Sequence, residues 1–118
     1  MKLINSFKYA VNGVLSSFKS ERNMKIHFII MAIVIVLGIL LNINAREWIT
    51  CIILFGIVIS AELFNTAIET TIDIIIKEKD EKAGLAKDIS AGAVLILAIS
   101  STIIGIIIFI PKIINFLF

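Results

Sequence analysis

Three acidic residues stand on one helical stripe in an apolar part of this sequence, and they are its clearest chemical feature. Residues 61–73 read AELFNTAIETTID. At 100° per residue, an α-helix places Glu62, Glu69 and Asp73 on one stripe, which also carries Asn65. An acid facing lipid in mid-membrane costs about 2.5–3.5 kcal/mol. We therefore expect the stripe to face partners, water or a cation, and to form a functional site.

The depth of these acids in a membrane separates their roles. If Trp48 marks the outer interface, Glu62 lies ~21 Å further along the helix, within the cytoplasmic leaflet. Glu69 then lies ~31 Å along, near the inner edge of a ~30 Å hydrocarbon core. A lipid headgroup can reach the first position and a soluble ligand the second. The two glutamates are ~10 Å apart, too far to clasp one ion together, so we expect different jobs.

Complementary charges are expected at the same membrane surface. Lys87 and Asp88 stand just before the last apolar run, and Glu21 stands at the start of the first. Carboxylates from two helices suit Mg²⁺, which takes a few carboxylates together with phosphate oxygens. A lysine neutralises phosphate as a point charge. The glycine-rich phosphate-binding motifs of soluble proteins are absent from the sequence, so metal and lysine must meet the charge of a nucleotide.

The composition identifies the environment of the chain. Its 118 residues are 59% hydrophobic and only 17% charged, which excludes a soluble globular domain, a disordered chain and a disulfide scaffold. The apolar runs are continuous, whereas a membrane β-barrel needs alternating polarity. We therefore predict a single-domain (1–118), all-α integral membrane protein. It has an amphipathic surface helix over 2–19 and membrane helices over 26–43, 48–76 and 89–110.

The ends of these elements and their orientation follow from individual residues. We expect Ser20 to cap the second helix, the charged stretch 77–88 to form a loop, and Pro111 to end the last helix. Nine of the eleven Lys and Arg residues lie before the first span or in the 77–88 stretch. The positive-inside rule places both segments in the cytoplasm. The net charge of +2 gives no indication of a nucleic-acid partner.

Several short motifs resemble a known family. The segment ELFNTAIE at 62–69, Asp73, AKD at 86–88 and AGAV at 91–94 resemble the small prokaryotic diacylglycerol kinase family, which includes the undecaprenol kinases. The similarity covers nearly the whole chain. It implies an ATP- and Mg²⁺-dependent lipid kinase of the bacterial inner membrane. It also implies a homotrimer whose active sites are shared between neighbouring subunits. The segment ERNMKIH at 21–27 looks more like the undecaprenol kinase branch.

The resemblance also implies a role for particular residues. Glu62 matches the general base of the family, Glu21 and Glu69 match its metal ligands, and Asn65 and Asp73 support them. The implied nucleotide contacts are Tyr9, Glu21, Glu69, Glu78, Lys79, Asp80, Lys87 and Asp88. The implied lipid contacts are Ser17, Phe18, Met24, Lys25, Ile26, His27, Phe28, Trp48 and Glu62.

Other functions remain open at this point. Undecaprenol is the expected acceptor, and diacylglycerol is the alternative. The sequence does not distinguish the two lipids, because each presents one hydroxyl above apolar tails. A small ion or proton transporter also places acids in a span, but a transporter needs a polar path to the far side. Here the span is apolar from Thr50 to Glu62 except for Ser60, which disfavours transport. A non-catalytic assembly subunit leaves the acidic stripe unexplained.

Overall fold

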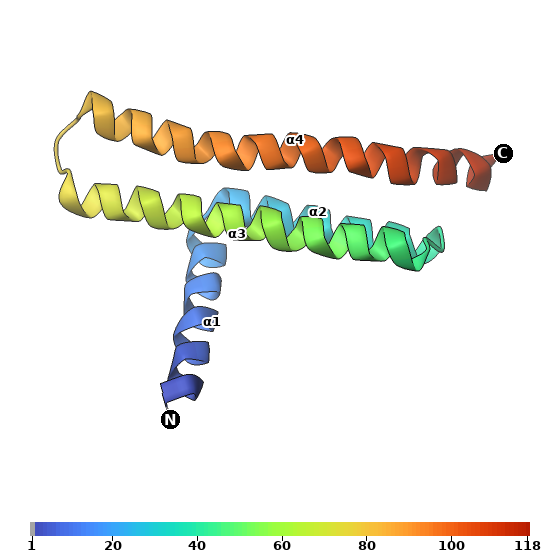
Figure 1. Cartoon of the computed structure of the whole chain (residues 1–118), viewed down its shortest axis with the longest axis horizontal. Helices are drawn as coiled ribbons and strands as arrows, with labels where there is room; N and C mark the ends of the chain where they lie inside the picture. The colour runs from blue at the N-terminus through green and yellow to red at the C-terminus, as the bar shows by residue number, and fades with distance from the viewer. Residues whose placement is uncertain (1) are drawn as a thin grey trace.

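Residues 2–118, the part of the chain that the computed structural model describes, form four α-helices (Figure 1). They are α1 (Lys2–Ser20), α2 (Arg22–Leu40), α3 (Ala45–Ile75) and α4 (Glu81–Leu117). The helices α2, α3 and α4 are each long and apolar enough to cross a membrane. The prediction of an all-α fold with three apolar spans after an N-terminal helix is confirmed.

The helix α3 is the centre of the arrangement, because it contacts each of the other three helices. It runs antiparallel to α4, and the shorter α2 lies along its first half (Figure 1). Within residues 2–118, α2 and α4 make no backbone contact with each other. The helix α1 projects sideways from the point where α2 begins (Figure 1). Residues in the second half of α3 therefore lie beside this junction.

The turn between α2 and α3 is closed by local hydrogen bonds. The side chain of Asn44 accepts a hydrogen bond from the backbone N–H of Glu47 at 2.9 Å, and the Glu47 carboxylate accepts one from the N–H of Asn44 at 3.0 Å. This reciprocal capping box starts α3 at Ala45, three residues before the predicted position. Asn42 adopts a left-handed φ of 53°, which asparagine tolerates better than most residues.

The prediction that 77–88 is a loop was wrong for its second part, because α4 already begins at Glu81. The carboxylate of Asp80 accepts a hydrogen bond from the backbone N–H of Lys82 at 3.2 Å and so caps the helix. The charged residues that follow are good helix formers that stay solvated in the first turns. Charge alone therefore does not indicate a loop here.

Two other predicted helix ends were also wrong. The helix α4 continues through Pro111 to Leu117, and the N–H of Phe118 still donates to the carbonyl of Ile114 at 2.9 Å. Proline removes a single donor, whereas ending the helix inside lipid leaves a whole turn of carbonyls unpaired. Likewise, Ser20 belongs to α1, and Glu21 is the N-cap residue of α2 without a side-chain cap bond.

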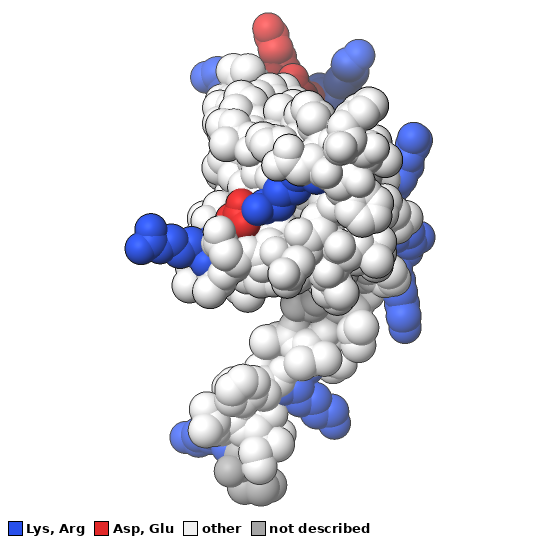
Figure 2. Space-filling model, turned by 90° about the vertical axis from the view of Figure 1, so that its right-hand side faces the viewer, with Lys and Arg blue, Asp and Glu red and all other residues white. Residues whose placement is uncertain are grey.

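The end of the bundle at the α2–α3 turn is tightly packed. Ile43, Cys51 and Phe109 are buried together there, and Trp48 packs against them. A Cβ atom on Gly38 would approach the Trp48 ring to 2.7 Å, so this position requires glycine for close helix contact. Viewed from this end, the surface is mostly uncharged, with an acidic and a basic side chain in contact near its middle and other charged side chains projecting around it (Figure 2).

Candidate active site

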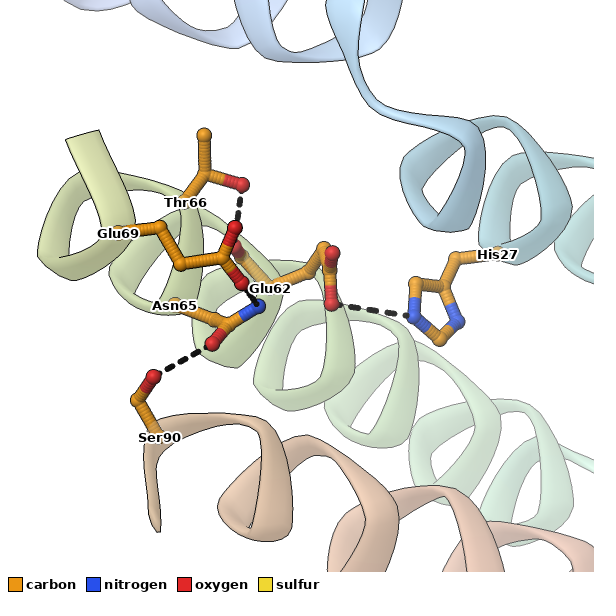
Figure 3. A network of polar contacts seen from close by, with 6 residues as sticks. All are labelled: His27, Glu62, Asn65, Thr66, Glu69 and Ser90. Atoms are coloured by element: carbon orange, nitrogen blue, oxygen red, sulfur yellow. Dashed lines mark hydrogen bonds and ion pairs between the residues drawn. The ribbon is translucent and has the colours of Figure 1, made fainter. Parts of the chain in front are cut away.

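A polar network connects α3 to α4 at the level of the acidic stripe (Figure 3). The side-chain amide of Asn65 donates to Oε1 of Glu69 at 3.0 Å. The hydroxyl of Ser90 on α4 donates to Oδ1 of Asn65 at 2.6 Å. Asn65 is 5% exposed, so its amide is held in one orientation by partners on both sides. The prediction that Asn65 supports one of the glutamates is consistent with this geometry.

Ser90 is a member of this network that the sequence analysis missed. Its hydroxyl also contacts the backbone carbonyl of Lys87 at 2.9 Å, one helical turn before it. A signal was present, because residues three apart share a helix face and Lys87 was already a candidate. What the sequence did not reveal was how α4 packs against α3, which places Ser90 beside Asn65.

Glu62 lies on the other side of the network and faces α2. Its side chain is 1% exposed, and its Oε2 lies 3.7 Å from Nε2 of His27 (Figure 3). Neither of these two atoms has a hydrogen-bond partner among residues 2–118. The backbone carbonyl of Glu62 accepts a bond from the Thr66 hydroxyl at 3.0 Å. The stripe is therefore partly satisfied, with an unpaired carboxylate oxygen at its most buried point.

Asp73 and Lys87 form an ion pair that joins the second half of α3 to the start of α4. The Asp73 side chain is 63% exposed and that of Lys87 is 35% exposed. An exposed ion pair of this kind contributes little to stability because water screens it. The Lys87 ammonium group can therefore exchange this partner for a phosphate at small energetic cost.

Glu21 and Glu69 lie at a common depth relative to Glu62. Glu21 precedes His27 by six residues on α2 and Glu69 follows Glu62 by seven on α3, so each stands ~9–10 Å from that level in the same direction. Both side chains are half-buried. Two carboxylates at one depth, at the start of α2 and on α3, are the kind of donor set expected for Mg²⁺ on phosphate.

Within residues 2–118, no three acidic, His or Cys side chains are close enough together to hold a metal ion alone. Mg²⁺ does not require such a cage, because it keeps water and phosphate oxygens among its ligands. Two half-buried carboxylates therefore fit a nucleotide-bound metal better than a permanently bound structural ion.

The other nucleotide candidates lie further from Glu62. Glu78 and Lys79 are exposed in the connection between α3 and α4, and Asp80 caps α4. Asp88 is exposed in the second turn of α4. Tyr9 is 71% exposed and lies ~16 Å along α1 from the end of that helix, so the single chain does not bring it to the others.

Most of the lipid candidates gather at the junction of α1 and α2. The rings of Phe18 and Phe28 contact edge to face across this junction, with centroids 5.3 Å apart. Met24 is fully buried and Ser17 is nearly so, whereas Ile26 is exposed. Trp48 is separated from this group, because it packs on Gly38 at the other end of the bundle.

An apolar groove of about 510 Å³ runs between α2 and α4, with α3 as its floor. It is lined by His27 and Ile30 at one end and by Leu37 and Phe109 at the other. It follows α2 for eleven residues, or ~16 Å. The groove therefore connects the surroundings of Glu62 with the interior of the bilayer.

Comparison of the sequence with known proteins identifies one family. The family model for prokaryotic diacylglycerol kinases matches residues 8–109. The chain is 39% identical to the undecaprenol kinase of Bacillus subtilis (strain 168), over 94% of this chain and 90% of that protein. It is 35% identical to a diacylglycerol kinase of Synechocystis, over 96% of this chain and 65% of that protein. A diacylglycerol kinase of Haemophilus influenzae is 37% identical over 80% of each chain. The chain therefore belongs to the prokaryotic diacylglycerol kinase family.

Proposed function

We propose that this protein transfers the γ-phosphoryl group of ATP to the hydroxyl of a membrane lipid alcohol, and that undecaprenol is the acceptor. Similarity to the Bacillus subtilis undecaprenol kinase over most of both chains supports this acceptor. The relatives named diacylglycerol kinase make diacylglycerol the alternative, with phosphatidic acid as the product. The observation that carries the proposal is the fully buried Glu62 carboxylate, unpaired at Oε2, beside an apolar groove.

The chemistry assigned to Glu62 follows from its surroundings. A carboxylate held among apolar side chains lies at the depth where the hydroxyl of an amphiphile ends, with its tail in the hydrocarbon. Glu62 accepts the hydroxyl proton as the oxygen forms its bond to the γ-phosphorus and the bond to the ADP oxygen breaks. Such in-line transfer depends mainly on positioning and on charge stabilisation. The fixed Asn65 network and the surrounding helices provide the positioning.

The phosphate end of the site is assigned to the groups nearer the water. Glu21 and Glu69 are the residues that would hold Mg²⁺, and the metal would offset the charge of the phosphate oxygens. Lys87 leaves Asp73 and neutralises the γ-phosphate. Glu78, Lys79, Asp80 and Asp88 surround the rest of the nucleotide, and Tyr9 approaches it when α1 lies against the membrane. The two glutamates thus have separate tasks, as their ~10 Å offset indicates.

The apolar groove between α2 and α4 is the place we assign to the acceptor's tail. The groove begins at His27, and so a lipid lying in it presents its head to Glu62. Its ~16 Å length is shorter than a ~30 Å hydrocarbon core. The groove therefore contacts the part of a long tail nearest the hydroxyl, and the remainder extends into lipid.

The protein is a multi-pass membrane protein, and we propose that it lies in the bacterial plasma membrane with its N-terminus and active site in the cytoplasm. The distribution of Lys and Arg supports this orientation. In this proposal α1 lies in the membrane surface, with Leu3, Phe7 and Val11 facing lipid. It joins α2 near the level of Glu69, which puts the metal ligands at the water boundary.

We propose a homotrimer in which each active site lies at an interface between chains: one chain supplies Glu21, Glu62 and Glu69, and its neighbour shields them from lipid. Large parts of α2, α3 and α4 expose apolar side chains such as Ile33, Ile57 and Ile103. Neighbouring copies or lipid must cover these surfaces. A polar stripe on a three-span protomer has little protein around it, and a second copy shields it from lipid.

The direct test is to supply the purified protein in mixed micelles with labelled ATP, Mg²⁺ and one lipid alcohol at a time. We expect label in undecaprenyl phosphate and not in phosphatidic acid. Label only in phosphatidic acid would assign diacylglycerol as the acceptor. Absence of label in either lipid, under conditions in which a known lipid kinase is active, would refute the proposed function.

A further inference from the structure

Two buried polar atoms face each other without partners at the most enclosed point of the site. Oε2 of Glu62 and Nε2 of His27 are 3.7 Å apart, within the distance of an ion pair if His27 is protonated (dashed line in Figure 3). Neither atom has a hydrogen bond among residues 2–118. The Glu62 side chain is 1% exposed and that of His27 is 14% exposed. Buried polar groups in folded proteins are nearly always paired, so this unpaired couple needs an explanation.

The separation itself suggests what completes the pair. A distance of 3.7 Å is too long for a direct hydrogen bond between the two side chains. It is short enough for one oxygen atom to lie about 2.8 Å from both. A hydroxyl group can donate its hydrogen to the carboxylate and accept a hydrogen bond from the imidazole N–H. Donor and acceptor on the two side chains therefore match one hydroxyl.

The surroundings of His27 favour a hydroxyl that belongs to an amphiphile. His27 lines the end of the apolar groove, where its neighbours include Ile26 and Ile30. The edge of the His27 ring that carries Nε2 faces the Glu62 carboxylate (Figure 3). A molecule with its tail in the groove therefore meets His27 and Glu62 with its first polar atom.

We propose that the acceptor hydroxyl binds between Nε2 of His27 and Oε2 of Glu62, so that His27 is a catalytic residue which holds the nucleophile. This proposal rests on the proposed function. His27 donates a hydrogen bond to the hydroxyl oxygen and keeps its own proton throughout. The hydroxyl proton passes to Glu62 as the oxygen–phosphorus bond forms. The bond between the γ-phosphorus and the bridging oxygen breaks, and ADP leaves with that electron pair.

Three substitutions of His27 separate hydrogen bonding from packing. The amide nitrogen of glutamine reaches the position of histidine Nε2, whereas that of asparagine reaches only the position of Nδ1. Leucine fills similar space without a donor. We expect His27→Gln to keep kcat/KM for the lipid within about 3-fold of wild type. His27→Asn and His27→Leu should lose about 10- to 100-fold, the size expected for one hydrogen bond to a charged or reacting group. KM for MgATP should stay unchanged in all three.

The result distinguishes the role of His27 from the proposed function. If the wild-type protein phosphorylates no lipid alcohol, the proposed function fails and this proposal fails with it. If the wild type is active and all three variants are as fast, His27 does not hold the hydroxyl. Equal losses in His27→Gln and His27→Leu also overturn the proposal, since packing alone then explains them. Thermal unfolding of each variant in detergent checks that the loss is not a loss of fold.

Discussion

The two ends of the α3–α4 pair are built in opposite ways. At the α2–α3 turn, polar groups pair within the chain: Asn44 and Glu47 cap each other, and Glu47 also pairs with Lys112 at 3.1 Å. At the other end, Oε2 of Glu62 and Nε2 of His27 have no hydrogen bond, and the Lys87 ammonium group is held only by an exposed ion pair. The first end is organised for stability, and the second keeps polar groups available for ligands. Unpaired buried groups persist in native proteins mainly where function requires them.

If this contrast is correct, substitutions at the second end should reduce turnover without reducing stability. The largest effect should come from Glu62→Gln, which keeps size and hydrogen bonding but removes the base. We expect kcat to fall by about 10²–10⁴-fold, typical of a lost acid–base group. Nucleotide affinity, measured by displacement of a labelled ATP analogue, should stay near wild type.

Glu69→Gln should have a different signature, because this residue is placed at the water side with the metal. We expect weaker apparent MgATP binding as well as slower turnover, with a shift in the Mg²⁺ concentration that gives half-maximal rate. The loss in kcat/KM for MgATP should be at least about 10-fold. Equal nucleotide affinities for Glu62→Gln and Glu69→Gln would contradict the division of labour between the two glutamates.

Substitutions at the first end should do the reverse. Gly38→Ala places a Cβ atom 2.7 Å from the Trp48 ring, so Trp48 or α2 must shift. We expect a destabilisation of about 1–3 kcal/mol, the usual cost of overpacking. Thermal unfolding in detergent measures it, and the specific activity of the folded fraction should be unchanged.

Gly105→Ala is the matched control, since nothing lies within 4 Å of a Cβ built on that helical residue. Alanine is the better helix former there by about 0.5–1 kcal/mol. This variant should therefore be as stable as wild type or more so. A loss of stability equal to that of Gly38→Ala would mean that close contact with Trp48 is not the cause.

A smaller effect is expected at the N-terminus of α3. Asn44→Ala removes the acceptor for the Glu47 N–H and should lower the free energy of unfolding by about 1 kcal/mol. Asn44→Ser keeps a capping oxygen and should lose less. Lipid phosphorylation by the folded protein should be the same in both variants. A fall in turnover with unchanged stability would break the contrast between the two ends.

The smallest expected effect is in a mixing experiment, where two inactive variants should not restore each other's activity. Glu21 and Glu69 of one chain lie at a common depth, ~9–10 Å from the level of Glu62, so we expect them to hold the metal within one chain. Mixed and reassembled Glu21→Ala and Glu69→Ala proteins should then stay inactive. Recovery to about a quarter of wild-type activity would instead show that neighbouring subunits contribute one glutamate each, because random mixing restores one interface in four. Mass spectrometry of differently tagged chains verifies subunit exchange.

The sequence by itself was sufficient for the membrane class, the three apolar spans and the acidic stripe. These features depend on composition and on helical periodicity, which are local properties of the chain. Continuous apolar runs require helices in lipid, and an acid within such a run requires a reason to be there. The identities of Glu62, Asn65 and Glu69 were predictable for the same reason.

Only the tertiary structure decided how residues from different helices meet. Ser90 reaches Asn65 because α3 and α4 pack against each other with these two residues side by side. Pro111 stays inside α4 because a membrane helix loses less by omitting one hydrogen bond than by ending. His27 faces Glu62 because α2 and α3 pack antiparallel, in a register that places these two residues side by side. Such contacts depend on helix register, and no local pattern of residues encodes register directly.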